Sequence, residues 1–183
     1  KERYAAKVAP LLAMQPAYDK ADQALALARR TDLAGAQKLA AEAARLAPKE
    51  ARFPQLQGDI ALAQKNPQAA LAYYQKSIVL DDGYFASHLG AGTAQYQLRT
   101  GDRGEAELTR SAKLLPTAPA LYYLGSIAKE AGNRQRAMEL LKGAAGSKNE
   151  LCKQAAAEYA SMNFSENGTK NIAKEMKYDS QSK

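Results

Sequence analysis

The sequence of 183 residues has no tryptophan, one cysteine, one histidine, seven prolines and twelve glycines. The single Cys152 excludes an internal disulfide framework and a cysteine-based zinc site, because both need several thiols. No apolar run approaches the ~18 residues that a membrane span needs, so we expect no membrane span. Alanine, leucine, lysine, glutamine and glutamate dominate, while helix breakers are scarce. This composition favours helices in a single domain that is long enough to bury a core.

Residues that carry common enzyme chemistry are also few. His88 is the only histidine, so a histidine metal cluster or a Ser/His/Asp triad lacks its parts. Helix packing is the favoured role for His88, and a binding or catalytic role is the alternative. The sequence contains no GxxxxGK[ST] phosphate loop, and Asp81–Asp82 fits a solvated helix end better than a general acid–base pair. We therefore predict no catalytic residue, no metal and no cofactor in this chain, which as it stands is not an enzyme.

The net charge of +7 comes from 26 basic and 19 acidic residues. In segments such as RTGDRGEAELTRSAK the two signs alternate, as they do on a solvated helix face. A nucleic-acid patch is the weaker alternative, because basic residues form no run and aromatic residues are not interleaved with them. We expect a protein or peptide partner and no nucleic acid.

An internal repeat of 34 residues runs through most of the chain. The last step is one residue shorter, because one residue is lost in the link at 116–119. Small residues and helix-ending residues recur at this spacing in four series: Ala24, Gly58, Gly92 and Gly125; Ala36, Ala70, Gly104 and Ala137; Ala43, Ser77, Ser111 and Ala144; and Pro48, Asp82 and Pro116.

Each unit is predicted to form two helices joined by a short turn. In the fourth unit, residues 121–131 carry one apolar stripe at helical spacing and residues 137–144 carry a second. Gly132 is expected to end the first helix, and Asn133 to cap the second. Gly125 costs roughly 0.5–1 kcal/mol of helix propensity, which close packing of the two helices would offset. The predicted helices are 17–30, 33–46, 51–64, 67–80, 85–98, 102–115, 118–131, 134–146 and 150–162.

This period, with small residues at its eighth, twentieth and twenty-seventh positions, resembles the tetratricopeptide repeat (TPR). The fourth unit carries the resemblance best, through Leu121, Leu124, Gly125, Ala128, Gly132, Ala137, Leu141 and Ala144. The resemblance implies an all-α fold, a right-handed α-solenoid of four TPR helix pairs plus a C-terminal capping helix. The units are placed at 17–50, 51–84, 85–117 and 118–149, and the capping helix at 150–162. Residues 1–16 are expected to form a connector interrupted by Pro10 and Pro16, and residues 163–183 a polar tail.

A TPR array binds its ligands on a concave groove lined by the first helix of each unit. The resemblance assigns this groove the residues Tyr18, Arg29, Arg52, Gln55, Asp59, Thr93, Tyr96, Gln97, Tyr122, Ser126 and Lys129. Tyrosine, arginine and glutamine combine contact area with hydrogen bonding. For Tyr96 and Tyr122 the groove is favoured, whereas for Tyr123 sealing against a neighbouring unit is favoured. The TPR subtype that clamps chaperone C-terminal carboxylates has Lys and Asn at positions 5 and 9, and no unit here has that pair.

The pieces EARFPQLQGD and LLPTAPALYYLG suggest a closer relationship. Over residues 17–145 the sequence resembles the TPR region that follows the catalytic domain of bacterial HtpX-like and BepA-like HEXXH zinc metallopeptidases. The chain has no HEXXH, so the resemblance implies the non-catalytic C-terminal part of a periplasmic or membrane-associated protease of envelope protein quality control. Zinc would belong only to the missing catalytic domain. Because the chain starts at Lys1 without a methionine, we expect it to be a fragment or a processed form.

Two alternatives from other classes remain open. One is a free-standing TPR scaffold of a secretion or pilus assembly, and the other is a nucleic-acid-binding helical repeat. An HEXXH motif upstream of Lys1 would favour the protease, and a steep salt dependence of binding would favour the nucleic-acid reader. The oligomeric state stays open.

Overall fold

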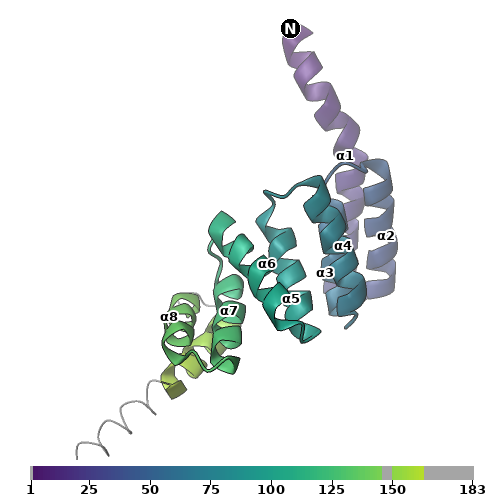
Figure 1. Cartoon of the computed structure of the whole chain (residues 1–183). Coiled ribbons are helices and arrows are strands. Elements are labelled where there is room, and N and C mark those ends of the chain that lie inside the picture. Colours follow the sequence, from purple (N-terminus) through teal and green to yellow (C-terminus); the bar gives the residue numbers. More distant parts are fainter. Residues whose placement is uncertain (1, 146–149, 163–183) are drawn as a thin grey trace, which may run out of the picture. The chain divides into compact units, whose positions relative to one another are not determined.

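The computed structural model describes residues 2–145 and 150–162, and of residues 2–7, 10, 11 and 101–103 it describes the backbone alone. The polar tail predicted at 163–183 lies outside the described residues. Within them the chain is all-helical, as predicted, and every helix is followed by a short turn (Figure 1). The helices are α1 (Glu2–Arg29), α2 (Leu33–Leu46), α3 (Arg52–Ala63), α4 (Pro67–Leu80), α5 (Phe85–Gln97), α6 (Gly101–Leu114), α7 (Ala118–Glu130), α8 (Arg134–Ala144) and a C-terminal helix at residues 150–162.

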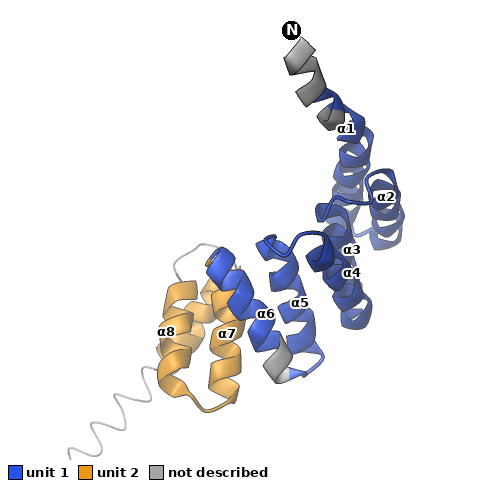
Figure 2. Ribbon diagram, turned by 45° about the horizontal axis from the view of Figure 1, so that its top comes forward, with its two compact units in different colours: residues 1–115 blue, residues 116–183 orange. Residues whose placement is uncertain are grey.

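The helices pair in the order that the repeat predicts. α1 packs against α2, α3 against α4, α5 against α6 and α7 against α8. The chain divides into two compact units, residues 1–115 and 116–183 (Figure 2), so the division falls in the link before the fourth repeat. Unit 1 therefore contains three helix pairs. Unit 2 contains the fourth pair and the C-terminal helix.

The prediction that prolines interrupt the first sixteen residues was wrong. α1 runs without a break from Glu2 to Arg29, and its first half extends past the end of α2 (Figure 1). A proline inside a helix leaves the carbonyl four residues earlier without its donor. For Pro16 that carbonyl belongs to Leu12, which is 65% exposed, so water can take the place of the missing amide. None of the described helices is long and apolar enough to cross a membrane.

The turn inside each helix pair has the same geometry in all four repeats. The backbone takes a left-handed conformation at Thr31 (φ 65°), Lys65 (φ 59°), Arg99 (φ 57°) and Gly132 (φ 77°). The amide of the next residue donates to the carbonyl five residues before it, as in a Schellman motif. The side chains of Asp32, Asn66 and Asn133 then accept from the amide three residues on and cap the second helix. The expected roles of Gly132 and Asn133 are confirmed.

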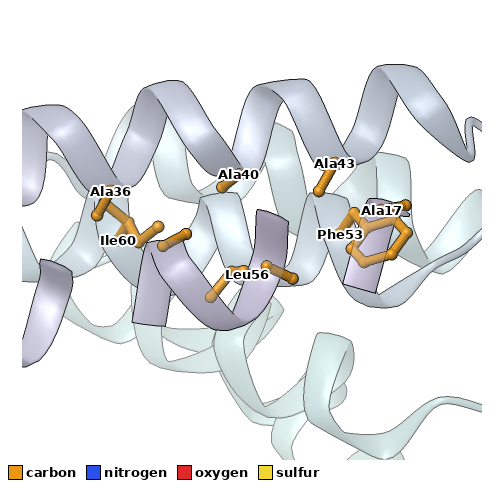
Figure 3. Packing of buried hydrophobic residues seen from close by; sticks show 9 residues of the cluster. Ala17, Ala36, Ala40, Ala43, Phe53, Leu56 and Ile60 are labelled. Carbon is orange, nitrogen blue, oxygen red and sulfur yellow. The ribbon is translucent and has the colours of Figure 1, made fainter. Parts of the chain in front are cut away.

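Small residues allow the two helices of a repeat to approach closely. In the first repeat the core is built from Ala17, Ala36, Ala40 and Ala43 with the larger Phe53, Leu56 and Ile60 of α3 against them (Figure 3). A methyl group added at Gly92 would lie 2.6 Å from Leu108 Cγ, and one at Gly125 would lie 2.9 Å from Leu141 Cγ. Both contacts are to the second helix of the glycine's own repeat. The predicted reason for these glycines is therefore confirmed.

The C-terminal helix closes the core of unit 2. Ala155 and Met162 are buried with Ala128, Leu141 and Ala144 of α7 and α8. Cys152 is a free thiol and is buried as well. The helix covers the apolar face of the last repeat, which is the role predicted for a cap.

Candidate functional site

All eleven predicted groove residues lie on first helices of the repeats. Tyr18 and Arg29 are on α1, and the three from the second repeat are on α3. The third repeat places its residues on α5, and the fourth on α7. Because α7 belongs to unit 2, its residues are considered separately from those of unit 1.

Tyr18 and Arg52 meet at the carboxylate of Glu50, which the sequence prediction missed. The Tyr18 hydroxyl donates to Glu50 Oε2 at 3.1 Å, and Arg52 Nε lies 3.8 Å from Glu50 Oε1. The ring of Tyr18 also packs edge-on against Phe53, with ring centroids 5.2 Å apart. Burial raises the pKa of Tyr18, and the neighbouring Glu50 carboxylate raises it further. The tyrosine is held on two sides, while the Arg52 side chain is 63% exposed.

Gln55 and Asp59 form a second polar group one turn further along α3. Asp59 accepts hydrogen bonds from Gln55 Nε2 at 2.5 Å and from the Tyr74 hydroxyl at 2.7 Å. Tyr74 comes from α4, and its fully buried ring fills the space between Gly58 of α3 and Gly90 of α5. A methyl group at either glycine would overlap that ring, so the small residues create the slot through which Tyr74 reaches Asp59.

Asp59 combines exposure with a perturbed pKa. The residue is exposed at the surface. Desolvation by the surrounding protein nevertheless raises the pKa of its carboxyl, and this outweighs the hydrogen bonds from Tyr74 and Gln55, which lower it. A group that water reaches from one side while protein surrounds it on the others belongs to a hollowed part of a surface. This agrees with the concave position that the repeat register assigns to Asp59.

Tyr84 joins the two polar groups and was also missed. It precedes α5, and burial raises the pKa of its hydroxyl; the charge of Arg52 lowers that pKa, and the carboxylates of Asp59 and Glu50 raise it. These charges therefore lie close to the Tyr84 ring. Glu50 and Tyr84 occupy the same position of successive repeats, just before the first helix. That shared position is the sequence signal that could have found them.

The remaining predicted residues of unit 1 are not part of this group. Thr93 is 8% exposed, which leaves little of its side chain for a ligand. Tyr96 is half-buried, and Arg29 and Gln97 are exposed. Within the described part of unit 1, neither Arg29 nor Gln97 makes a hydrogen bond or ion pair with the residues around Asp59. We call Tyr18, Glu50, Arg52, Gln55, Asp59 and Tyr84 the α3 surface.

In unit 2 the chain itself engages two of the predicted residues. Tyr122 donates to Glu158 Oε1 at 3.2 Å, and Lys129 Nζ lies 2.9 Å from Glu158 Oε2. Glu158 belongs to the C-terminal helix. Ser126 is 6% exposed, and its hydroxyl donates to the carbonyl of Tyr122. A ligand would have to compete with the C-terminal helix for these side chains.

His88 is a packing residue, as predicted. It is 3% exposed, and its Nδ1 lies 2.7 Å from Glu107 Oε2 of α6. Its Nε2 lies 2.9 Å from the carbonyl oxygen of Asp82, whose carboxylate also pairs with Arg110 at 2.6 Å. The imidazole thus connects α5, α6 and the turn before α5. Over residues 2–145 and 150–162, no three His, Cys, Asp or Glu side chains gather as ligands for a metal ion.

No family model matches the chain, and none of the curated proteins matches it. Solved structures do resemble it. MamA residues 41 to the end, from Desulfovibrio magneticus, superposes with a TM-score of 0.69 at 17% identity, covering 89% of this chain and 92% of that one. The TPR domain of Arabidopsis OM64 gives a TM-score of 0.61 at 19% identity, covering 64% of this chain and 98% of that one.

The first TPR of Spaghetti (RPAP3), solved with the HSP90 peptide SRMEEVD bound, gives a TM-score of 0.62 at 15% identity. That likeness covers 64% of this chain and 94% of the other. At such identities the likeness concerns the fold. Together with the helix pairs and their repeated turns, it shows that the chain has the fold of a TPR domain.

Proposed function

We propose that the chain is a non-catalytic protein-interaction domain that binds a peptide segment of its partner on the α3 surface. The carrying observation is the grouping of two tyrosine rings, an exposed arginine and an exposed carboxylate on one side of unit 1. Aromatic and arginine side chains of this kind dominate the energetics of peptide and protein binding. The fold adds support, because the first TPR of Spaghetti binds its HSP90 peptide within the same architecture.

The geometry of the α3 surface suits a ligand with little regular structure. Tyr18 is fixed by Glu50 and Phe53, and the Tyr74 hydroxyl fixes Asp59. Groups that are already ordered lose less conformational entropy when a ligand binds. Tyrosine rings offer area to the ligand, while Gln55 and Asp59 offer hydrogen bonds to its backbone or side chains. No step of this mechanism needs a metal or a cofactor.

Peptide selection followed by substitution tests the proposal. Peptides selected by the full chain from a random twelve-residue phage library should bind it in fluorescence anisotropy. Tyr84→Ala should weaken that binding by about 2 kcal/mol if the ring is a hot spot. The control is Val79→Ser, which changes a residue that is 86% exposed on the second helix α4. Unchanged affinity of every selected peptide for the Tyr84→Ala and Tyr18→Ala variants would overturn the proposal.

We also propose, more narrowly, that the chain is the C-terminal part of a periplasmic or membrane-associated zinc metallopeptidase. The support is the sequence resemblance over residues 17–145. Reading the gene upstream of the Lys1 codon tests it, and an HEXXH motif on a helix-forming segment is the expected result. An upstream sequence without that motif would favour the free-standing scaffold of a secretion or pilus assembly.

A nucleic-acid-binding role is the remaining alternative. The net charge of +7 is its support. A protein that neutralises several phosphates loses affinity steeply as salt rises. Titration of the chain with a labelled single strand between low and physiological salt should give only weak binding if the peptide proposal is right.

A further inference from the structure

The α3 surface is acidic although the chain as a whole is basic. The charges that act on the Tyr84 hydroxyl are those of Arg52, Asp59, Glu50 and Asp81, which are one cation and three carboxylates. The net charge of the whole chain is +7. The sign of this surface therefore opposes that of its surroundings, and long-range attraction by the whole molecule cannot account for its choice of ligand.

Arg52 neutralises only part of this acidic charge. Its guanidinium lies 3.8 Å from Glu50, which already accepts the Tyr18 hydroxyl. Asp81 accepts the amide of Gly83 within its own turn. Asp59 is left as an exposed carboxylate whose two partners, Gln55 and Tyr74, are both uncharged.

Asp59 has room for another donor. An ionised carboxylate offers about four lone-pair positions, and Gln55 and Tyr74 occupy one on each oxygen. Desolvation raises the pKa of this carboxyl, so a cation beside it would relieve an unfavourable charge. The rings of Tyr18 and Tyr84 lie beside the same carboxylates, and such rings pack well against the stems and charged heads of lysine and arginine.

We propose that the α3 surface selects a peptide segment that presents a lysine or arginine side chain to Asp59. This inference rests on the proposed peptide-binding function. An acidic peptide would meet three carboxylates and only one cation, Arg52, so the sign of the surface favours a basic ligand. The position that holds a carboxylate-binding pair in the chaperone-binding TPR domains holds Gln55 and Asp59 here, and Asp59 can only accept when it is ionised.

The experiment uses the full chain and the peptides that it selects from the random twelve-residue library. The selected peptides should be enriched in lysine or arginine at one fixed position. Replacing that residue by glutamine in a labelled peptide should weaken binding to the parent chain about fivefold. The same change should have almost no effect on binding to the Asp59→Asn variant, which keeps an acceptor for Tyr74 and loses the charge.

Two further variants separate recognition from structure. Glu139→Gln removes a carboxylate from α8 of unit 2 and should leave the fivefold preference intact. Tyr74→Phe removes a structural partner of Asp59 but keeps its charge, so the preference for the basic residue should persist. Circular dichroism of each variant verifies that it is folded.

The outcomes distinguish this inference from the proposed function. Selected peptides that need Tyr84 but show no basic position, or that lose the same affinity on Asp59→Asn as on the parent, would overturn the inference and leave the function standing. Peptides that ignore both Tyr84 and Tyr18, or a library without binders, would overturn both. A preference for acidic peptides would mean that Arg52, not Asp59, sets the specificity.

Discussion

Replacing Gly92 by alanine should destabilise the chain more than replacing Gly125 does. The alanine methyl at Gly92 would lie 2.6 Å from Leu108 Cγ, 2.9 Å from the Leu108 amide nitrogen and 3.0 Å from the carbonyl oxygen of Gly104. Ordinary carbon contacts are about 3.5–4.0 Å. Two of these three atoms belong to the backbone of α6, so the helix itself would have to move by several tenths of an ångström or more.

At Gly125 the methyl would instead meet side-chain atoms. Leu141 Cγ lies at 2.9 Å, Leu141 Cδ2 at 3.0 Å and Leu140 Cβ at 3.4 Å. A leucine side chain can adjust by a small rotation, whereas a packed backbone cannot. Both substitutions gain roughly 0.5–1 kcal/mol of helix propensity. Overpacking costs about 1–3 kcal/mol, so we expect a net loss of about 1–2 kcal/mol for Gly92→Ala and less than about 1 kcal/mol for Gly125→Ala.

Urea denaturation followed by circular dichroism at the helix band measures this difference. Because the chain has two compact units, the parent curve must first be tested for more than one transition. The loss for Gly92→Ala should appear in the transition of unit 1. Equal stability of Gly92→Ala and the parent, or a larger loss for Gly125→Ala, would refute the reasoning from helix approach.

Three further predictions concern backbone strain and Asp59. Lys65→Gly should raise the free energy of unfolding by about 0.5–1 kcal/mol in urea, because Lys65 adopts φ 59°; a loss of stability would contradict the strain. Tyr74→Phe should lower that free energy by about 1–2 kcal/mol, since a buried donor to a carboxylate is lost; an unchanged urea midpoint would contradict this. The raised pKa of Asp59 means that its contribution to stability is fully present below its unfolded-state pKa and is lost as pH rises through its folded-state pKa. The parent should therefore lose stability relative to Asp59→Asn as pH rises from about 4, and the opposite slope in urea melts would contradict the desolvation.

The helix pairs could be predicted because the repeat imposes the same packing problem four times. The alanines and glycines that recur every 34 residues mark where two helices must approach, and Gly92 and Gly125 are found at those places. The continuity of α1 through Pro10 and Pro16 was not predictable in this way. A local rule penalises an internal proline, but exposure to water weakens the penalty, and exposure follows only from the folded arrangement.

The candidate site was predicted in part. The register placed Tyr18, Arg52, Gln55 and Asp59 on first helices, and the structure brings them into two neighbouring polar groups. Glu50 and Tyr84 were outside the family's list of groove positions because they precede the helices. Their roles depend on contacts between repeats, which no single-repeat pattern encodes.

Burial accounts for the other differences at the site. Thr93 and Ser126 sit at predicted groove positions, but the structure buries both. Tyr122 and Lys129 contact Glu158 of the C-terminal helix, which lies beyond the repeats used for the register. A repeat pattern assigns the side of a helix on which a residue lies, but it cannot say whether another segment covers that side.

Mapping a selected peptide onto the chain by nuclear magnetic resonance tests the central claim most directly. Titration of the isotope-labelled full chain with that peptide should shift the backbone amides of residues 50–59 and of Tyr84 and Phe85. The amides of the second helices α4 and α8 should not move beyond the noise. Shifts concentrated on α4, on α8 or on the C-terminal helix, with residues 50–59 unchanged, would contradict the account.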